Sequence, residues 1–412
     1  MKYVDKQVQT LKETGQKEVL DVLQYRKTLN PSESEVRTLC QDFLRKHDTL
    51  LPKALQQEII DAITFSIVGL GPLEFLLRDD SVSEIMVNGG DNIFVERKGH
   101  LEKTKLRFTN EKQLIQVINR IVGQVGRRID ESNPLVDARL LDGSRVNAII
   151  SPLSLKGASL TIRKFPTKAF TISDMLTYES CNQAMADFLE FAVLSRQNLL
   201  VSGGTGAGKT STLNACASLI PHKERLITIE DSAEIRIDHP HFVSLESRNA
   251  NVEGTGEIPI RQLLKNALRM RPDRIVVGEI RGGEAIDMLQ AMNTGHKGSL
   301  TTVHANSPLE SLYRVETMVL MGDVELPLAA IRSQVVQGID IVVQQERLPN
   351  GQRKITQIAE VVKNMRAADY ELRPIFWYDF KEETFCITDQ MPDCLKNSRY
   401  QESEIIKTWF KQ

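Results

Sequence analysis

The sequence has few cysteines, and their spacing excludes one common kind of site. Only five cysteines occur among 412 residues, an odd number, and none belongs to a C-x-x-C pair. Such scattered residues favour reduced thiols in the cytoplasm and argue against a structural zinc site. The five are Cys40, Cys181, Cys216, Cys386 and Cys394.

Long apolar runs and a net charge of either sign are also lacking. Hydrophobic residues make up 41% of the chain, yet no run approaches the roughly 18 apolar residues that span a bilayer. The first twenty residues lack the apolar core of a signal peptide. Lys and Arg total 52 against 54 for Asp and Glu, so no basic field indicates nucleic-acid binding. We expect a cytoplasmic protein of two or three domains that binds no nucleic acid.

What the sequence does contain is a phosphate-binding loop. The segment GGTGAGKTS fits the pattern G-x-x-x-x-G-K-[ST], follows an apolar run at 198–201 and precedes a helix-compatible run at 210–219. Glycines let backbone N–H groups face the phosphates, and the helix N-terminus adds partial positive charge. Lys209 would reach the β- and γ-phosphates, and Thr210 would bind Mg²⁺. The predicted ATP-binding residues are Gly203, Gly204, Thr205, Gly206, Ala207, Gly208, Lys209, Thr210 and Ser211.

Two further apolar runs end in carboxylates. The first run, RIVV at 274–277, is β-branched after its arginine and is followed by Gly278 and Glu279. The second run, LITI at 226–229, is followed by Glu230 and Asp231. Buried parallel strands have this form, and their carboxyl ends face the nucleotide in such sheets. The pair of acidic strand ends favours a site for a metal and a water. The alternative is that these carboxylates lie in ordinary surface turns after two core strands.

Four motifs in a fixed order resemble the secretion ATPases of type II and type IV machines. After GGTGAGKT come IEDSAE at 229–234, RMRPDRIVVGEIRGGEA at 269–285 and TGHKGSLTTVHANSP at 294–308. In that superfamily they are the Walker A loop, the Asp box, an atypical Walker B motif and the His box. Within it, the chain is similar to CpaF-type or TadA-type ATPases of tight-adherence pilus systems. That likeness rests on the Walker B block and on residues 71–89 and 126–165.

The resemblance implies roles for four residues of the motifs. Glu230 would be the base or the carboxylate that positions the water, and Glu279 the Walker B acid near Mg²⁺. His296 and His304 would sense the nucleotide state between the phosphates and a neighbouring subunit. A lone histidine is more often a satisfied polar residue than a catalyst, so a positional switch is the better interpretation.

The resemblance also implies catalytic arginines in the N-terminal domain. Arg145 and Arg163 match the family's arginines there, and Arg128 and Arg139 are weaker candidates. Phosphoryl transfer spreads negative charge over the γ-oxygens, and a second domain or subunit often supplies the counter-charge. The alternative is solvated charge on exposed strand faces.

The expected fold class is α/β. A helical arm at 1–51 precedes a smaller α+β domain at 52–165 that contains hairpins turning at 88–90 and 142–143 and a helix at 111–125. A hinge linker follows at 166–171. Residues 172–412 alternate strands and helices, which predicts a RecA-like P-loop domain with a twisted, mainly parallel sheet. Residues after about 365 form a C-terminal appendix of unassigned role.

The function that the resemblance implies is that of an Mg-dependent ATPase motor for pilus assembly or protein secretion. It would form a homohexamer on the cytoplasmic face of the inner membrane, peripheral to it through platform proteins. Domain rocking about the hinge would push the platform and extrude pilin. Two alternatives stay open: a type IV secretion ATPase for DNA or effector transfer, and an ATP-binding scaffold without turnover.

Overall fold

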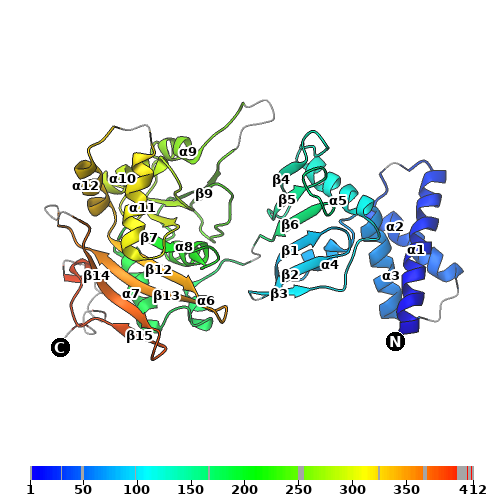
Figure 1. Cartoon of the computed structure of the whole chain (residues 1–412), viewed down its shortest axis with the longest axis horizontal. Coiled ribbons are helices and arrows are strands. Elements are labelled where there is room, and N and C mark those ends of the chain that lie inside the picture. Colours follow the sequence, from blue (N-terminus) through cyan, green and yellow to red (C-terminus); the bar gives the residue numbers. More distant parts are fainter. Residues whose placement is uncertain are drawn as a thin grey trace. The chain divides into compact units, whose positions relative to one another are not determined.

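The computed structural model describes residues 2–28, 30–47, 51–97, 99–165, 168–248, 255–322, 325–364, 369–396, 406 and 410. The chain forms two compact units, Met1–Thr167 and Lys168–Gln412, and Figure 1 shows their elements. Of the predicted hinge at 166–171, Pro166 and Thr167 lie outside the described residues.

Three helices begin the first unit: α1 (Lys2–Tyr25), α2 (Glu33–Lys46) and α3 (Lys53–Ile67). The side chain of Ser32 caps α2 by accepting a hydrogen bond from the backbone N–H of Glu35. Buried residues of all three helices form one hydrophobic cluster. Ile59 and Ile63 of α3 are buried with residues of α1 and α2. Helix α3 therefore packs with the predicted helical arm, although the predicted boundary at 51/52 placed it in the next domain.

The rest of the first unit is a six-stranded antiparallel sheet with helices α4 (Leu73–Leu77) and α5 (Glu111–Gln124). Five buried residues of α5 pack on the sheet. The two predicted hairpins are confirmed by the pairing of β1 with β2 and of β4 with β5. From edge to edge the strands are β3 (His100–Lys103), β2 (Ile93–Arg97), β1 (Val82–Asn88), β6 (Ser159–Arg163), β5 (Arg145–Ile149) and β4 (Leu135–Arg139).

A nine-stranded mixed sheet forms the second unit. The strands from β12 to β9 are parallel, and β13, β14 and β15 add antiparallel pairs at one edge. The order is β15 (Thr384–Ile387), β14 (Leu372–Asp379), β13 (Arg353–Val361), β12 (Ile341–Arg347), β7 (Leu199–Gly203), β11 (Leu300–Val303), β10 (Arg274–Val277), β8 (Leu226–Glu230) and β9 (Phe242–Glu246).

Helices cover both faces of this sheet (Figure 1), so its central strands β7 and β10 are buried along their whole length and are mostly apolar. Leu199 and Val201 of β7 join one hydrophobic cluster, and Leu200 between them joins the other. The first cluster includes α6 (Ile172–Thr177), α7 (Gln183–Leu194), α8 (Lys209–Ala217) and α13 (Asp393–Lys396). The second includes α9 (Ile260–Ala267), α10 (Glu284–Asn293), α11 (Pro308–Leu320) and α12 (Leu328–Gly338).

The segment predicted as a C-terminal appendix is instead part of the main sheet. Strand β14 pairs with β13, and Ile375 and Phe376 of β14 are buried in the same cluster as the core of β7. The sheet therefore continues beyond the β12–β13 hairpin. Residues 365–368, where the appendix was expected to begin, and Trp409 lie outside the described residues.

Candidate nucleotide site

The loop after β7 has the backbone that a phosphate-binding loop requires. Gly206 and Gly208 have φ angles of 71° and 97°, in the left-handed region where side chains are strained. A Cβ on Gly203 would lie 2.3 Å from the carbonyl oxygen of Gln345. Glycine is therefore needed at all three positions, and the loop leads directly into the N-terminus of α8.

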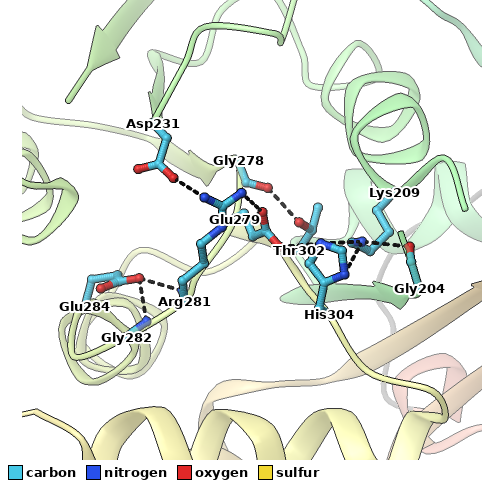
Figure 2. Close-up of polar contacts among 10 residues, drawn as sticks. All are labelled: Gly204, Lys209, Asp231, Gly278, Glu279, Arg281, Gly282, Glu284, Thr302 and His304. Carbon is cyan, nitrogen blue, oxygen red and sulfur yellow. Dashed lines mark hydrogen bonds and ion pairs between the residues drawn. The ribbon is translucent and has the colours of Figure 1, made fainter. Parts of the chain in front are cut away.

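Lys209, the first residue of α8, is held in place by neighbours around the loop. Its Nζ donates to the carbonyl oxygen of Gly204 at 3.1 Å and lies 3.3 and 3.2 Å from the two ring nitrogens of His304 (Figure 2). Burial lowers the pKa of the Lys209 ammonium, and the nearby Glu279 carboxylate opposes this effect. The cation is thus buried and poised beside the loop.

The carboxylate of Glu279 lies between two basic side chains. Arg281 donates to Glu279 Oε2 from Nη2 at 2.6 Å and from Nε at 2.9 Å, and its Nη1 donates to Asp231 Oδ2 at 2.8 Å. His304 Nε2 lies 3.0 Å from Glu279 Oε1. Figure 2 shows a continuous series of contacts from Asp231 through Arg281, Glu279 and His304 to Lys209.

The imidazole of His304 is best described as neutral in this arrangement. Burial and the cation of Lys209 lower its pKa. A neutral ring protonated on Nε2 leaves Nδ1 to accept from Lys209, while Nε2 faces the Glu279 carboxylate. His304 then links the phosphate-binding lysine to the Walker B acid without adding a charge.

Glu230, at the end of β8, is a buried carboxyl with a raised pKa. Glu230 is only 3% exposed. Its Oε1 accepts hydrogen bonds from the backbone N–H groups of Glu234 and Ile235 at 2.9 and 3.0 Å. Within the described chain Oε2 has no hydrogen-bond partner. Burial raises the pKa to about 7, which suits a base that works near neutral pH.

The neighbouring backbone is shaped around this carboxyl. A Cβ on Gly278 would lie 2.9 Å from Cγ of Glu230, so the Gly-Glu ending of the Walker B motif leaves room for it. Thr302 on β11 donates to the carbonyl oxygen of Gly278 at 2.8 Å. The chain turn that carries Glu279 is thereby fixed against the adjacent strand.

The donors near the loop fit a magnesium ion. The hydroxyl of Thr210 in the first turn of α8 and the carboxylate of Glu279 are the hard oxygen ligands that Mg²⁺ prefers. The orphaned Oε2 of Glu230 offers a further acceptor for a water. Assignment of Thr210 and Glu279 to the metal remains a prediction.

His296 does not join this group of residues. It follows α10 and precedes β11, whereas His304 follows β11. The four residues of β11 span roughly 13 Å at about 3.3 Å each. His296 therefore lies toward the amino ends of the parallel strands, whereas the P-loop follows the carboxyl end of β7. Its carbonyl accepts from Ser299 Oγ at 2.7 Å. Of the two histidines, His304 is the one that contacts Lys209 in the described part of this unit.

The predicted arginines belong to the other compact unit, where they form a row across adjacent strands. Arg145 on β5 is directly opposite Arg163 on β6 and Arg139 on β4. Arg145 and Arg163 are exposed. The row places like charges on neighbouring strands, and its part in catalysis remains a prediction. Arg128 instead forms an ion pair with Asp130.

Sequence reasoning assigned no role to two arginines in the second unit. Arg281 bridges the acids that end β8 and β10, and Arg353 on β13 donates from Nε to the carbonyl oxygen of Gly206 at 2.9 Å. The first follows Gly-Glu-Ile in the Walker B block, a position that could have signalled it. The second lies 147 residues from Gly206 in the sequence, and no local pattern marks it.

Residues 67–369 match the family model described as "Type II/IV secretion system protein". The chain belongs to this family. A protein of Mycobacterium tuberculosis strain H37Rv named "Putative conjugal transfer protein" is 37% identical over 299 residues, 71% of this chain and 84% of the relative. The conjugal transfer protein TrbB of Rhizobium radiobacter is 32% identical over 314 residues, 75% and 90% of the two chains. VirB11 of Bartonella henselae is 29% identical, covering 72% and 93%.

Solved structures with low identity share the fold. The Legionella pneumophila ATPase DotB matches with a TM-score of 0.51 at 20% identity, over 82% of this chain and 85% of that one. The pilus retraction motor PilT with bound ADP also gives 0.51, at 18% identity and the same coverage. The fold prediction is confirmed: a RecA-like α/β ATPase domain follows a smaller N-terminal domain.

The comparisons establish the type II/IV secretion family and leave the subtype open. The relatives named above carry conjugal-transfer and type IV secretion names, so membership of the tight-adherence group remains a prediction. Across the described parts of the chain, every helix is too short or too polar to cross a membrane.

Proposed function

We propose that this family member is an Mg-dependent ATPase that powers a secretion or pilus-assembly machine. The observation that carries the proposal is the series of contacts from Asp231 to Lys209. It joins the carboxyl ends of β8, β10 and β11 to the P-loop. A phosphate-binding cation and two acids therefore meet at the carboxyl ends of these parallel strands.

Each residue then has a role in phosphoryl transfer. The loop N–H groups and Lys209 hold the phosphates, and Thr210 and Glu279 would hold Mg²⁺, which neutralises charge on the phosphate oxygens when bound. Glu230, with its pKa raised to about 7, accepts the proton of the attacking water. His304 contacts both Lys209 and Glu279, so a change in the position of either residue also changes the surroundings of the other.

The arginine row supplies the coupling step of the proposal. Arg145 and Arg163 give the γ-phosphate additional charge-assisted contacts when the N-terminal domain closes over it, in the same or a neighbouring copy. Closure about the 166–171 linker converts turnover into movement. In the tight-adherence version, a cytoplasmic homohexamer pushes an inner-membrane platform and extrudes pilin.

A second candidate is a type IV secretion ATPase of a transfer system. The names of relatives at 37% and 32% identity favour it, and the same site chemistry serves both functions. The two candidates differ in the partners of the motor. Co-purification of the tagged chain from its native membranes should recover two polytopic platform proteins in the first case and transfer-channel components in the second.

Steady-state hydrolysis of Mg-ATP by the full chain tests the enzymatic part. Glu279→Gln and Glu230→Gln should each keep ATP affinity and lose at least about a hundredfold in kcat, the usual contribution of a positioned base or metal contact. Glu279→Gln should cost more, because the metal contacts several phosphate oxygens. Wild-type turnover in both variants would refute the site, and ATP binding without any hydrolysis would favour the scaffold alternative.

A further inference from the structure

The β12–β13 hairpin borders the P-loop on the side away from His304. Strand β7 pairs with β11 on one side and with β12 on the other. Gln345 of β12 is the register partner of Gly203, and its Oε1 accepts from Thr212 of α8 at 2.7 Å. Arg347 follows two residues later, so it lies on the same face as Gln345 and beyond the end of β7.

Two arginines meet at the tip of this hairpin. Arg347 is directly opposite Arg353, and residues paired in this way point to the same face of a sheet. Arg353 Nε donates to Gly206 O at 2.9 Å. A Cβ on Gly208 would lie 3.1 Å from Arg353 Cδ, and one on Gly206 would lie 3.7 Å from Arg347 Nη1. Both guanidinium groups therefore reach the phosphate-binding loop.

Arg347 and Arg353 thus add positive charge on the β12 side of the loop. Near the γ-phosphate position the loop already has Lys209, and the acids for Mg²⁺ and water lie on the β10 and β8 side. A nucleotide whose γ-phosphate lies on that side would extend its phosphate chain across the loop. Its other end, the α-phosphate and the nucleoside, then faces β12.

We propose that Arg347 and Arg353 bind the α- and β-phosphates of the nucleotide, so that the β12–β13 hairpin forms the second wall of the site. This inference rests on the proposed function, because it requires a nucleotide in the P-loop. A guanidinium donates two parallel hydrogen bonds to phosphate oxygens, which a lysine cannot reproduce. The arginines contact groups that ATP and ADP share.

Equilibrium titration of fluorescent ATP and ADP analogues into the full-length protein tests this assignment. Arg347→Gln and Arg353→Gln should each weaken both nucleotides by the same factor, roughly tenfold to a hundredfold for a lost charged hydrogen bond. Arg353→Lys should recover only part of the affinity. Lys381→Gln, an exposed cation at the tip of the neighbouring β14–β15 hairpin, should leave affinity unchanged.

The outcomes separate this inference from the P-loop assignment. Unchanged affinity in both arginine variants, with Lys209→Ala unable to bind, overturns the hairpin contacts and leaves the P-loop intact. Loss confined to ATP also overturns them, because it assigns the arginines to the γ-phosphate. Unchanged binding by Lys209→Ala overturns the proposed function itself. Thermal unfolding identifies any variant that fails to fold. If Arg353→Gln fails to fold, the nucleotide affinities of Arg347→Gln and Arg353→Lys test the hairpin contacts instead.

Discussion

His304 Nε2 lies 3.0 Å from Glu279 Oε1, although the two residues follow different strands of the sheet. Strands β10 and β11 are parallel neighbours, so their carboxyl ends bring the two side chains together. The same imidazole contacts Lys209. A phosphate that draws Lys209 away from His304 therefore also changes the surroundings of Glu279.

Replacing Lys209 with alanine should abolish detectable nucleotide binding. A buried cation that forms charge-assisted contacts with the β- and γ-phosphates is lost, while the helix that carries it remains intact. Isothermal titration with Mg-ATP measures the effect. Lys223→Ala, which removes an exposed lysine before β8, is the matched control and should bind normally. Equal affinity in the two variants would contradict the P-loop assignment.

Glu230→Gln should change how stability depends on pH. Burial raises the pKa of Glu230 in the folded state to about 7, above the ordinary value of 4.5, so between these values the folded state retains a proton that the unfolded state releases. Stability therefore falls as pH rises through this window, by roughly 3 kcal/mol in total. Glutamine keeps the oxygen that accepts from Glu234 and Ile235 and removes the charge.

Urea unfolding at pH 5 and pH 8 measures this difference. The variant should be more stable than the wild type at pH 8 and should differ little at pH 5. Glu257→Gln, at an exposed position, should show no such change. A pH profile identical to that of the wild type in Glu230→Gln would show that Glu230 does not titrate abnormally.

Arg281→Ala should lower kcat and also lower the Mg²⁺ concentration needed for half-maximal hydrolysis. The guanidinium orients Glu279 and Asp231, so its removal misplaces the acid and costs about tenfold in rate, as a lost charged hydrogen bond does. It also removes a cation that competes with Mg²⁺ for Glu279. Magnesium titrations of activity measure both effects, with Arg269→Ala as the exposed control. An increased Mg²⁺ requirement would show that Arg281 does not compete with the metal.

Arg145→Ala and Arg163→Ala should reduce turnover by at least about tenfold while ATP affinity changes little. Their contacts form in the closed state, where the γ-phosphate gains charge-assisted hydrogen bonds that the open state lacks. Unfolding should show little change in stability, because both side chains are exposed. Arg107→Ala, exposed in the same unit, is the control. Normal kcat in both variants would exclude the arginine row from catalysis.

Arg274→Met should destabilise the second unit by about 3 kcal/mol or more, the usual cost of breaking a buried ion pair. Arg274 is fully buried, and it donates to Glu224 Oε2 at 2.6 Å and to the carbonyl oxygens of Gly298 and Val193. Arg196→Met removes the more exposed cation beside Glu224 and should cost less than about 1 kcal/mol. Urea unfolding compares them, and equal losses would contradict the special role of burial.

Local patterns in the sequence were sufficient for the P-loop and for the strands that end in acids. The spacing from Gly203 to Lys209 and the apolar runs before Glu230 and Glu279 depend on neighbouring residues, and β7, β8 and β10 lie where these patterns predicted. The hairpins β1–β2 and β4–β5 were predicted for the same reason, because glycine turns between alternating segments act over a few residues.

Only the tertiary structure decided which distant residues meet. It buried α3 with α1 and α2, added β14 and β15 to the main sheet, and separated His296 from the P-loop. It also placed Arg353 against Gly206. These outcomes depend on strand order and on the burial of apolar faces, which are set by the whole packed unit, whereas composition and periodicity report only on each segment by itself.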